Sequence, residues 1–280
     1  VLASSDPNNT NATFFIRIDT MSGINSVSGS GRVSPLGKAD IHWLIIPAPG
    51  AAGEDPRGTL YYVGATLRYL LHGEEQVTVV KPDHIYVEPM PKLTMDYFLP
   101  ADVFGDDLAT EAVESPVPFT LGVRVLNRGF GPARNLKIES AQPKIIDNRQ
   151  GLEIGFRITG SEVNGEPATE SLLVNFGDIA PNAAGVARWL MECTLSGEFV
   201  EFTAYYTHAD ELGGELTSLL DEVNTHELVQ NVLVDLSGRD AIGDFLAREG
   251  DGYRVYESDG VDSAVEDKSA SAQWQYVGKS

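Results

Sequence analysis

The stretch Leu121–Ile138, LGVRVLNRGFGPARNLKI, decides the fold class. Apolar residues alternate with other residues from Leu121 to Val125, which is the two-residue period of a half-buried strand. Asn127–Gly129 supplies residues that tolerate positive φ, and Pro132 fixes the exit from the turn. A phosphate-binding loop would contain a third glycine or a Lys-Ser/Thr pair and would lead into a helix. Here a second strand-like run follows, so the stretch is predicted to be a strand, a turn and a strand.

The same pattern continues in both directions from this stretch. Runs rich in β-branched and aromatic residues are punctuated by Gly, Pro, Asn and Asp. Helical periodicity is confined to two short segments, at 216–228 and 240–248. We therefore predict an all-β protein built from antiparallel β-sandwiches. The strand-like runs lie at 14–19, 39–46, 59–71, 75–80, 119–126, 135–138, 152–158, 171–176, 186–195 and 198–206.

An internal repeat indicates two related modules. The sequence Gly-Arg-Val-Ser-Pro ends at Pro35 and is followed by Trp43. The sequence Gly-Asp-Ile-Ala-Pro ends at Pro181 and is followed at the same distance by Trp189. Gly-x-apolar-x-Pro is typical of a strand that ends in a turn, because proline cannot pair within a ladder. We expect both tryptophans to fill the space between two sheets.

The repeat divides the chain into three parts. We predict a first immunoglobulin-like module at 1–88, a second at 89–236, and an acidic extension at 237–280 with a short helix and a terminal strand. The fold class is thus two tandem immunoglobulin-like antiparallel β-sandwiches with an acidic C-terminal extension and at most short helices. One clear strand precedes the Gly31 turn. The first module is therefore expected to be incomplete and to receive a strand from a neighbour.

Two motifs of the second module carry a resemblance to a known family. The matching residues are Val123, Val125, Asn127, Gly129, Gly131, Ala133 and Asn135, then Gly177, Asp178, Ile179, Ala180 and Pro181. This pattern resembles the CARDB-type immunoglobulin-like modules of large secreted and cell-surface proteins of bacteria and archaea, and the resemblance extends over roughly 14–236. It implies a spacer, adhesive or assembly role outside the cell or at its surface, and no catalytic residues. The insert at 147–170 departs from a compact module of that type.

Charge and composition exclude several classes of partner. The chain has 41 acidic and 20 basic residues and a net charge of −21. It repels phosphate backbones and anionic lipid surfaces, so we expect no nucleic acid and no membrane insertion. No apolar run approaches the ~18 residues of a membrane-spanning helix. Cys193 is the single cysteine and alternates with Met191 and Trp189, so we expect a buried, inert thiol.

Acid-rich loops are candidate Ca²⁺ sites, because Ca²⁺ takes six to eight oxygen ligands from flexible loops. No spacing matches an EF-hand, and solvated charged loops are the alternative interpretation. His208 with Asp210 and Glu211 is a candidate metal site, and an exposed loop is the alternative interpretation. The candidate Ca²⁺ ligands are Asp102, Asp106, Asp107, Asp251, Asp259 and Asp262.

Two Asn-x-Thr sequons begin at Asn8 and Asn11 and are candidate glycosylation sites in a secreted protein. No Gly-x-Ser-x-Gly elbow is present, and we expect no enzymatic activity. We expect a structural or adhesive extracellular protein whose partners are further copies of itself or neighbouring domains of a longer chain. Strand complementation would join the copies head-to-tail into a filament.

The alternative is a Ca²⁺-dependent module that binds carbohydrate or protein. Sugars would stack on tyrosine rings, with acidic side chains holding the cation between them. The competing interpretation is that these tyrosines pack within the sandwich. The tyrosines concerned are Tyr61, Tyr62, Tyr69, Tyr205 and Tyr206.

Overall fold

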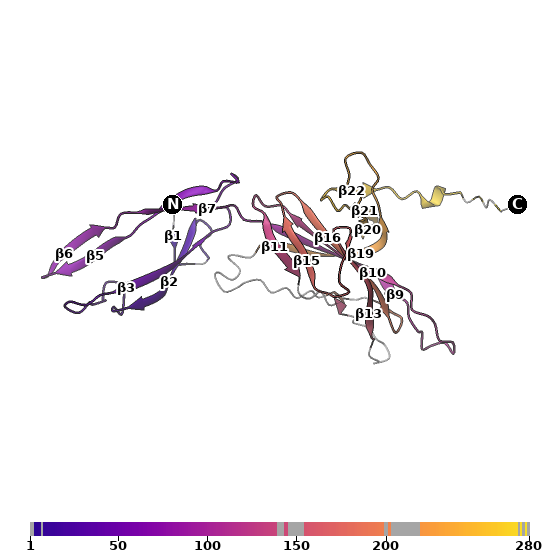
Figure 1. Ribbon diagram of the computed structural model, residues 1–280, viewed down its shortest axis with the longest axis horizontal. Coiled ribbons are helices and arrows are strands. Elements are labelled where there is room, and N and C mark those ends of the chain that lie inside the picture. The colour runs from indigo at the N-terminus through magenta and orange to yellow at the C-terminus, as the bar shows by residue number, and fades with distance from the viewer. Residues whose placement is uncertain are drawn as a thin grey trace. The chain divides into compact units, whose positions relative to one another are not determined.

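The computed structural model describes residues 3–138 apart from Pro7, together with 143–144, 154–198, 201–202, 219–273, 275 and 278. The described residues up to Met90 form one compact unit, unit 1, and those from Pro91 onward, apart from Leu219, form unit 2. The prediction of an all-β protein is confirmed, because these residues form strands and a single 3-10 turn at Ser269–Ser271 (Figure 1). The described part of the chain contains no helix with the length and apolarity to span a bilayer.

Unit 1 is built from short antiparallel pairs. Its strands are β1 (Ala3–Ser4), β2 (Phe14–Ser22), β3 (Asp40–Pro47), β4 (Thr59–Val63), β5 (Thr66–Leu71), β6 (Glu74–Val79) and β7 (Asp83–Val87). Strand β2 pairs antiparallel with β3 and parallel with β1. Strands β4 and β7 pair with each other, as do β5 and β6. Because β5 follows β4 and β6 precedes β7, the two pairs form successive parts of one two-stranded ribbon.

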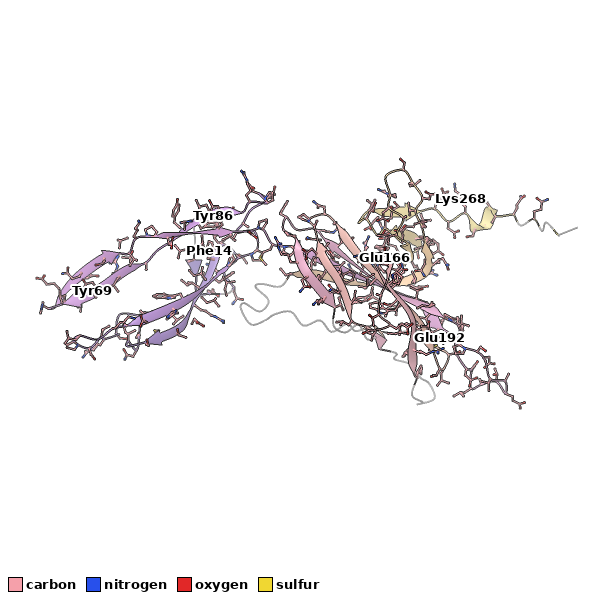
Figure 2. The ribbon with its side chains drawn as sticks, in the orientation of Figure 1. Phe14, Tyr69, Tyr86, Glu166, Glu192 and Lys268 are labelled. Atoms are coloured by element: carbon pink, nitrogen blue, oxygen red, sulfur yellow. The ribbon has the colours of Figure 1, made fainter. Side chains whose placement is uncertain are left out.

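The core of unit 1 lies where this ribbon covers the start of β2. Phe14 is buried with Ala51, Ala52 and Val87, and Ile45, Tyr61 and Ile85 pack against them. The rings of Phe14 and Tyr61 meet edge to face at 4.8 Å. Figure 2 shows Phe14 directed between the two layers of unit 1. The strands that cover Phe14 in this cluster are β4 and β7.

Unit 2 contains a large mixed sheet in the order β14-β13-β16-β10-β8-β19-β20-β21-β22 and a separate pair, β11–β15. Short pairs β9–β17 and β12–β18 lie outside both. The strands are β8 (Leu93–Leu99), β9 (Asp102–Val103), β10 (Phe119–Asn127), β11 (Ala133–Ile138), β12 (Pro143–Lys144), β13 (Phe156–Val163), β14 (Glu166–Pro167), β15 (Val174–Ile179), β16 (Ala184–Cys193), β17 (Gly197–Glu198), β18 (Glu201–Phe202), β19 (Leu220–Val232), β20 (Asp244–Glu249), β21 (Gly252–Tyr256) and β22 (Asp262–Val265).

One face of the large sheet packs on β11–β15 in the manner of a β-sandwich. A side chain at Gly185 of β16 would meet the rings and methyl groups of Phe176 and Ile179 on β15. Trp189 is four residues after Gly185 and therefore lies on the same face of β16. It is fully buried, and its Nε1 donates to the carbonyl of Ser171. Its assignment as a core residue is confirmed. Cys193 is also buried as expected, and burial raises the pKa of its thiol.

The strand–turn–strand interpretation of the Leu121–Ile138 stretch is confirmed as β10, a turn and β11. The turn is held by the fully buried side chain of Asn127. Its Oδ1 accepts from the backbone N–H of Gly129, and its Nδ2 donates to the carbonyls of Gly131 and Ile179. The Asn127 amide thus joins β10, the turn and β15 and satisfies backbone groups that would otherwise be buried without partners.

The other face of β10 is covered as well, contrary to the expectation of a half-buried strand. The sheet turns back on itself beyond β19, so that β20 lies over β8 and β10. Phe245 of β20 stacks on Phe98 of β8 with ring centroids 4.3 Å apart. A side chain at Gly122 would lie 2.3 Å from the Phe245 ring. Strands β8 and β10 are therefore central to three layers, and residues of both alternations are buried.

Three local predictions are wrong. The segments with helical periodicity overlap β19 and β20 in their described residues from Leu220 and from Asp244 onward. Phe245 and Ala247 alternate into the core, and β19 pairs on both sides. The first Gly-x-apolar-x-Pro motif lies between β2 and β3 rather than at a strand end, whereas its counterpart ends β15 at Ile179. Trp43 is 43% exposed, so it is not a core residue of the chain by itself.

Candidate functional site

Two features of the chain stand out as candidate sites: a buried charged cluster in unit 2 and an exposed apolar surface in unit 1. The charged cluster is centred on Arg124 of β10, which is 1% exposed. Its Nη2 lies 2.9 Å from Oδ2 of Asp96 on β8, and its Nη1 lies 2.5 Å from Oδ1 of Asp262 on β22. Nη1 also donates to the backbone carbonyl of Glu257 at 3.2 Å. Arg124 therefore bonds the central strands to the covering strands β20–β22.

Asp96 is held by three partners. Besides Arg124, Nε2 of His226 lies 3.1 Å from Oδ1 of Asp96, and Asn224 donates to the same oxygen at 3.2 Å. Burial by itself raises the pKa of Asp96, but the hydrogen bond with His226 and the charge of Arg124 outweigh it, so the pKa lies below its ordinary value. Asp96 is thus an ionised carboxylate within the layers.

A second ion pair closes the outer end of the cluster. Nε of Arg239 lies 2.7 Å from Oε2 of the buried Glu257, and Ser263 donates to Oε1 of Glu257 at 2.6 Å. Nη1 of Arg239 lies 3.5 Å from Asp259. Each charge in the cluster is paired with an opposite one, which is the arrangement that a buried ion network needs to be tolerated. These contacts fasten β20–β22 to the rest of unit 2.

The predicted Ca²⁺ ligands are distributed over separate places. Asp259 and Asp262 belong to the charged cluster, where Asp262 pairs with Arg124 and Asp259 with Arg239. Asp251 lies in the β20–β21 turn, at the opposite end of β21. Asp106 and Asp107 belong to a loop in which Asp106 accepts from the backbone of Glu114, and Asp102 lies in β9. Among the described residues, no three His, Cys, Asp or Glu side chains are grouped to hold a metal. Bound Ca²⁺ stays an untested prediction.

The other predicted binding residues lie mostly on the surface of unit 1. Asn8 and Asn11 of the sequons are exposed in the turns before β2. Tyr62 and Tyr69 are exposed, and Tyr61 is part of the unit 1 core. Tyr205, Tyr206 and the His208 cluster lie outside the described residues. Tyr86, which no sequence pattern singled out, is exposed on the outer face of β7 (Figure 2).

The apolar surface of unit 1 begins as one face of the β2–β3 pair. Side chains alternate across a sheet, so residues paired with odd-numbered positions of β3 share one face. Phe14 and Ile16 lie opposite Pro47 and Ile45 on this face. Further along, Ile18 lies opposite Trp43 and Met21 opposite Ile41. A β-bulge between Ile18 and Thr20 adds one residue to β2 and so keeps Met21 on the apolar face.

Among the described residues of unit 1, a covering layer packs only on the first part of this face. Phe14 and Ile45 pack under β4–β7, whereas Ile18, Met21 and Trp43 are each more than one-third exposed. We call the second part, formed by Ile18, Met21, Ile41 and Trp43, the open face. It is the direct continuation of a core, and it consists entirely of large apolar side chains.

The second exposed element is the β5–β6 hairpin, Thr66–Val79. Within the described residues its strands pair only with each other, and large apolar side chains are exposed on both of its faces. Leu70 and Val79 are 73% and 72% exposed. Figure 2 shows Tyr69 on this hairpin, beyond the part of the ribbon that covers Phe14. The exposed residues are Leu67, Tyr69, Leu70, Leu71, Val77 and Val79.

A two-stranded hairpin with no other sheet contact is marginally stable in water. Its turn is well formed, because His72 and Gly73 have φ of 53° and 87°, as a two-residue type I′ turn requires. The strands, however, bury almost none of their apolar side chains. Such a hairpin is typical of a segment that packs against another protein surface.

No family model, no curated protein and no solved structure matches the chain.

Proposed function

We propose that the protein is a non-enzymatic structural or adhesive protein of the cell exterior that assembles head-to-tail with copies of itself. The observation that carries the proposal is that unit 1 has an apolar sheet face whose core stops at β4–β7, beside a hairpin with apolar side chains on both faces. In the part of the chain that the structure describes, neither feature has a covering layer that would stabilise it. A neighbouring copy supplies both.

The low net charge of the two apolar surfaces permits contact between copies of this acidic chain. The chain has a net charge of −21, so two copies repel each other over most of their surface. Residues 14–47 carry three basic and two acidic side chains, and residues 66–79 carry one basic and two acidic ones. Both surfaces are therefore nearly neutral, and they are the places at which two such acidic chains approach each other at least cost.

The location outside the cell is supported by the resemblance of the β10–β11 turn and the end of β15 to modules of secreted and cell-surface proteins. The exposure of both sequon asparagines, Asn8 and Asn11, is compatible with this location. The buried ion network of unit 2 supports a structural role, since its charges are directed at one another between the layers.

Light scattering after size exclusion tests the assembly. Wild type is expected to exceed the monomer mass of 30.3 kDa increasingly as its concentration rises. A hairpin variant, Leu67→Ser with Leu70→Ser and Val79→Ser, is expected to remain at the monomer mass. The matched control is Tyr62→Ser with Tyr86→Ser, which removes equally exposed rings from the outer face of β4–β7 and is expected to assemble like wild type.

Wild type that stays at 30.3 kDa at every concentration would contradict the proposal. Growth that stops at twice this mass would contradict head-to-tail assembly, because a closed pair has no free surface to extend.

A Ca²⁺-dependent carbohydrate- or protein-binding module is the second candidate. It is favoured by the exposed rings of Tyr62 and Tyr86 on neighbouring strands, which offer faces for stacking. Glycan binding that is lost with Tyr62→Ser and Tyr86→Ser, or in EDTA, would support it.

A further inference from the structure

We infer that the β5–β6 hairpin of one copy packs on the open face of β2–β3 in the next copy. This inference rests on the proposed self-assembly and specifies its two surfaces. The donor is the hairpin Thr66–Val79, and the acceptor is the open face of Ile18, Met21, Ile41 and Trp43.

The covered part of unit 1 shows which kind of layer packs on this face of β2–β3. There, β4–β7 lies over β2–β3 and inserts Tyr61, Ile85 and Val87 against Phe14 and Ile45. The hairpin is the continuation of the β4–β7 ribbon, and the backbone N–H of Val80 donates to the carbonyl of Ala65 at the junction. It therefore carries the same kind of apolar two-stranded layer that the face already accepts along its first half.

The hairpin does not cover the open face of its own chain. With the hairpin formed, Trp43 remains 43% exposed, and Leu67, Leu70 and Val79 are each more exposed than Trp43. The strands of the hairpin pair with each other and with no other described strand. Donor and acceptor are thus both present and both uncovered, which is the condition for exchange between copies.

Charge permits close contact between the hairpin and the open face. Strands β2 and β3 carry Arg17 against Asp19 and Asp40, and the hairpin carries Arg68 against Glu74 and Glu75. Each surface has one more acidic than basic side chain in a chain whose net charge is −21, so the repulsion between two copies is small at this contact.

The contact is directional, because it joins two different surfaces of the chain. One copy uses its hairpin on a second copy and offers its open face to a third. Such a heterologous contact forms an open filament when the rotation between copies does not close a ring. Each contact would bury Trp43 and the hairpin leucines, and the removal of this apolar area from water would stabilise the filament.

Pairs of single substitutions test the contact. Chains with Ile18→Cys and chains with Tyr69→Cys are tagged differently, mixed in equal amounts at an assembling concentration and oxidised. Both positions are exposed, and the natural Cys193 is buried, so folding and background are little affected. The mixed disulfide is expected to exceed the sum of the two like disulfides several-fold. Random collision would make them equal. A second pair, Met21→Cys with Leu67→Cys, is expected to behave in the same way.

Chains with Tyr62→Cys are the control and are expected to give no excess of mixed disulfide with Ile18→Cys. If the chains assemble but yield mainly disulfides between two copies of Tyr69→Cys or between two copies of Ile18→Cys, the inference is overturned while the proposed function stands. If the Ile18→Cys/Tyr69→Cys double variant closes within one chain and remains monomeric, the exchange between copies is overturned. If light scattering shows no assembly at all, the proposed function itself fails.

Discussion

Trp43 and Trp189 follow the same motif at the same distance, yet they lie in different surroundings. Trp189 is buried between β16 and β11–β15, whereas Trp43 is on an apolar face that β4–β7 does not reach. Alternation along a strand assigns each tryptophan to an apolar face. Whether another layer covers that face depends on residues far away in the chain.

At the residue scale, acid is expected to destabilise unit 2 through Asp96. Its pKa in the folded protein lies below the ordinary 3.8, so the ionised carboxylate stabilises the fold at pH above about 4. This stabilisation is lost as the pH falls through the folded-state pKa. Urea unfolding followed by tryptophan fluorescence is expected to show a falling free energy of unfolding from about pH 5 to about pH 2. In Asp96→Asn this fall is expected to be smaller, from a lower starting stability.

The control for this experiment is Asp55→Asn in unit 1. A hydrogen bond from Arg57 lowers the pKa of Asp55 to about 2, but the pair is at the surface and is screened by solvent. The acid dependence of this variant is expected to equal that of wild type. An Asp96→Asn variant with an unchanged acid dependence would show that Asp96 is not the group responsible.

At the element scale, β10 shows how a strand pattern is misinterpreted. Its alternation predicts one buried face, and the structure buries both, because β20 returns over the second face. Gly122 gives room for Phe245, and Arg124 finds Asp262 at 138 positions' distance in the sequence. Neither role has a local signal. In β19 the inward Asn224 and His226 conceal the alternation, since both are polar and bond Asp96.

The closeness of β10 and β20 predicts the effect of Gly122→Ala. The added methyl group would lie 2.3 Å from the Phe245 ring, so the ring and β20 have to shift. Overpacking of this kind costs about 1–3 kcal/mol in the free energy of unfolding, measured by urea denaturation. Gly160→Ala in β13 is the matched control, because its methyl group would meet Leu190 at an ordinary 3.7 Å. Equal stability of both variants would contradict the packing of β20 on β10.

At the scale of the whole molecule, the net charge of −21 opposes the assembly that the apolar surfaces favour. Salt screens this repulsion, with a Debye length of about 10 Å at 0.1 M and about 3 Å at 1 M. The mass measured by light scattering is therefore expected to rise with NaCl. Surface ion pairs as the main contact would give the opposite trend. CaCl₂ at matched ionic strength separates screening from specific Ca²⁺ binding, because only the latter exceeds the effect of NaCl.

The sequence by itself determined the local structure of this protein. Alternating β-branched residues, together with Gly and Pro turns, specify strands such as β10, β11 and β15, since side-chain period and turn conformation are local properties. It also predicted an incomplete first module, and this stays a prediction. Only the tertiary structure decided which faces are covered, that Arg124 and Asp96 form a buried pair, and that Trp43 and the β5–β6 hairpin remain in water. Burial depends on which distant strands meet, and strand alternation carries no information about that pairing.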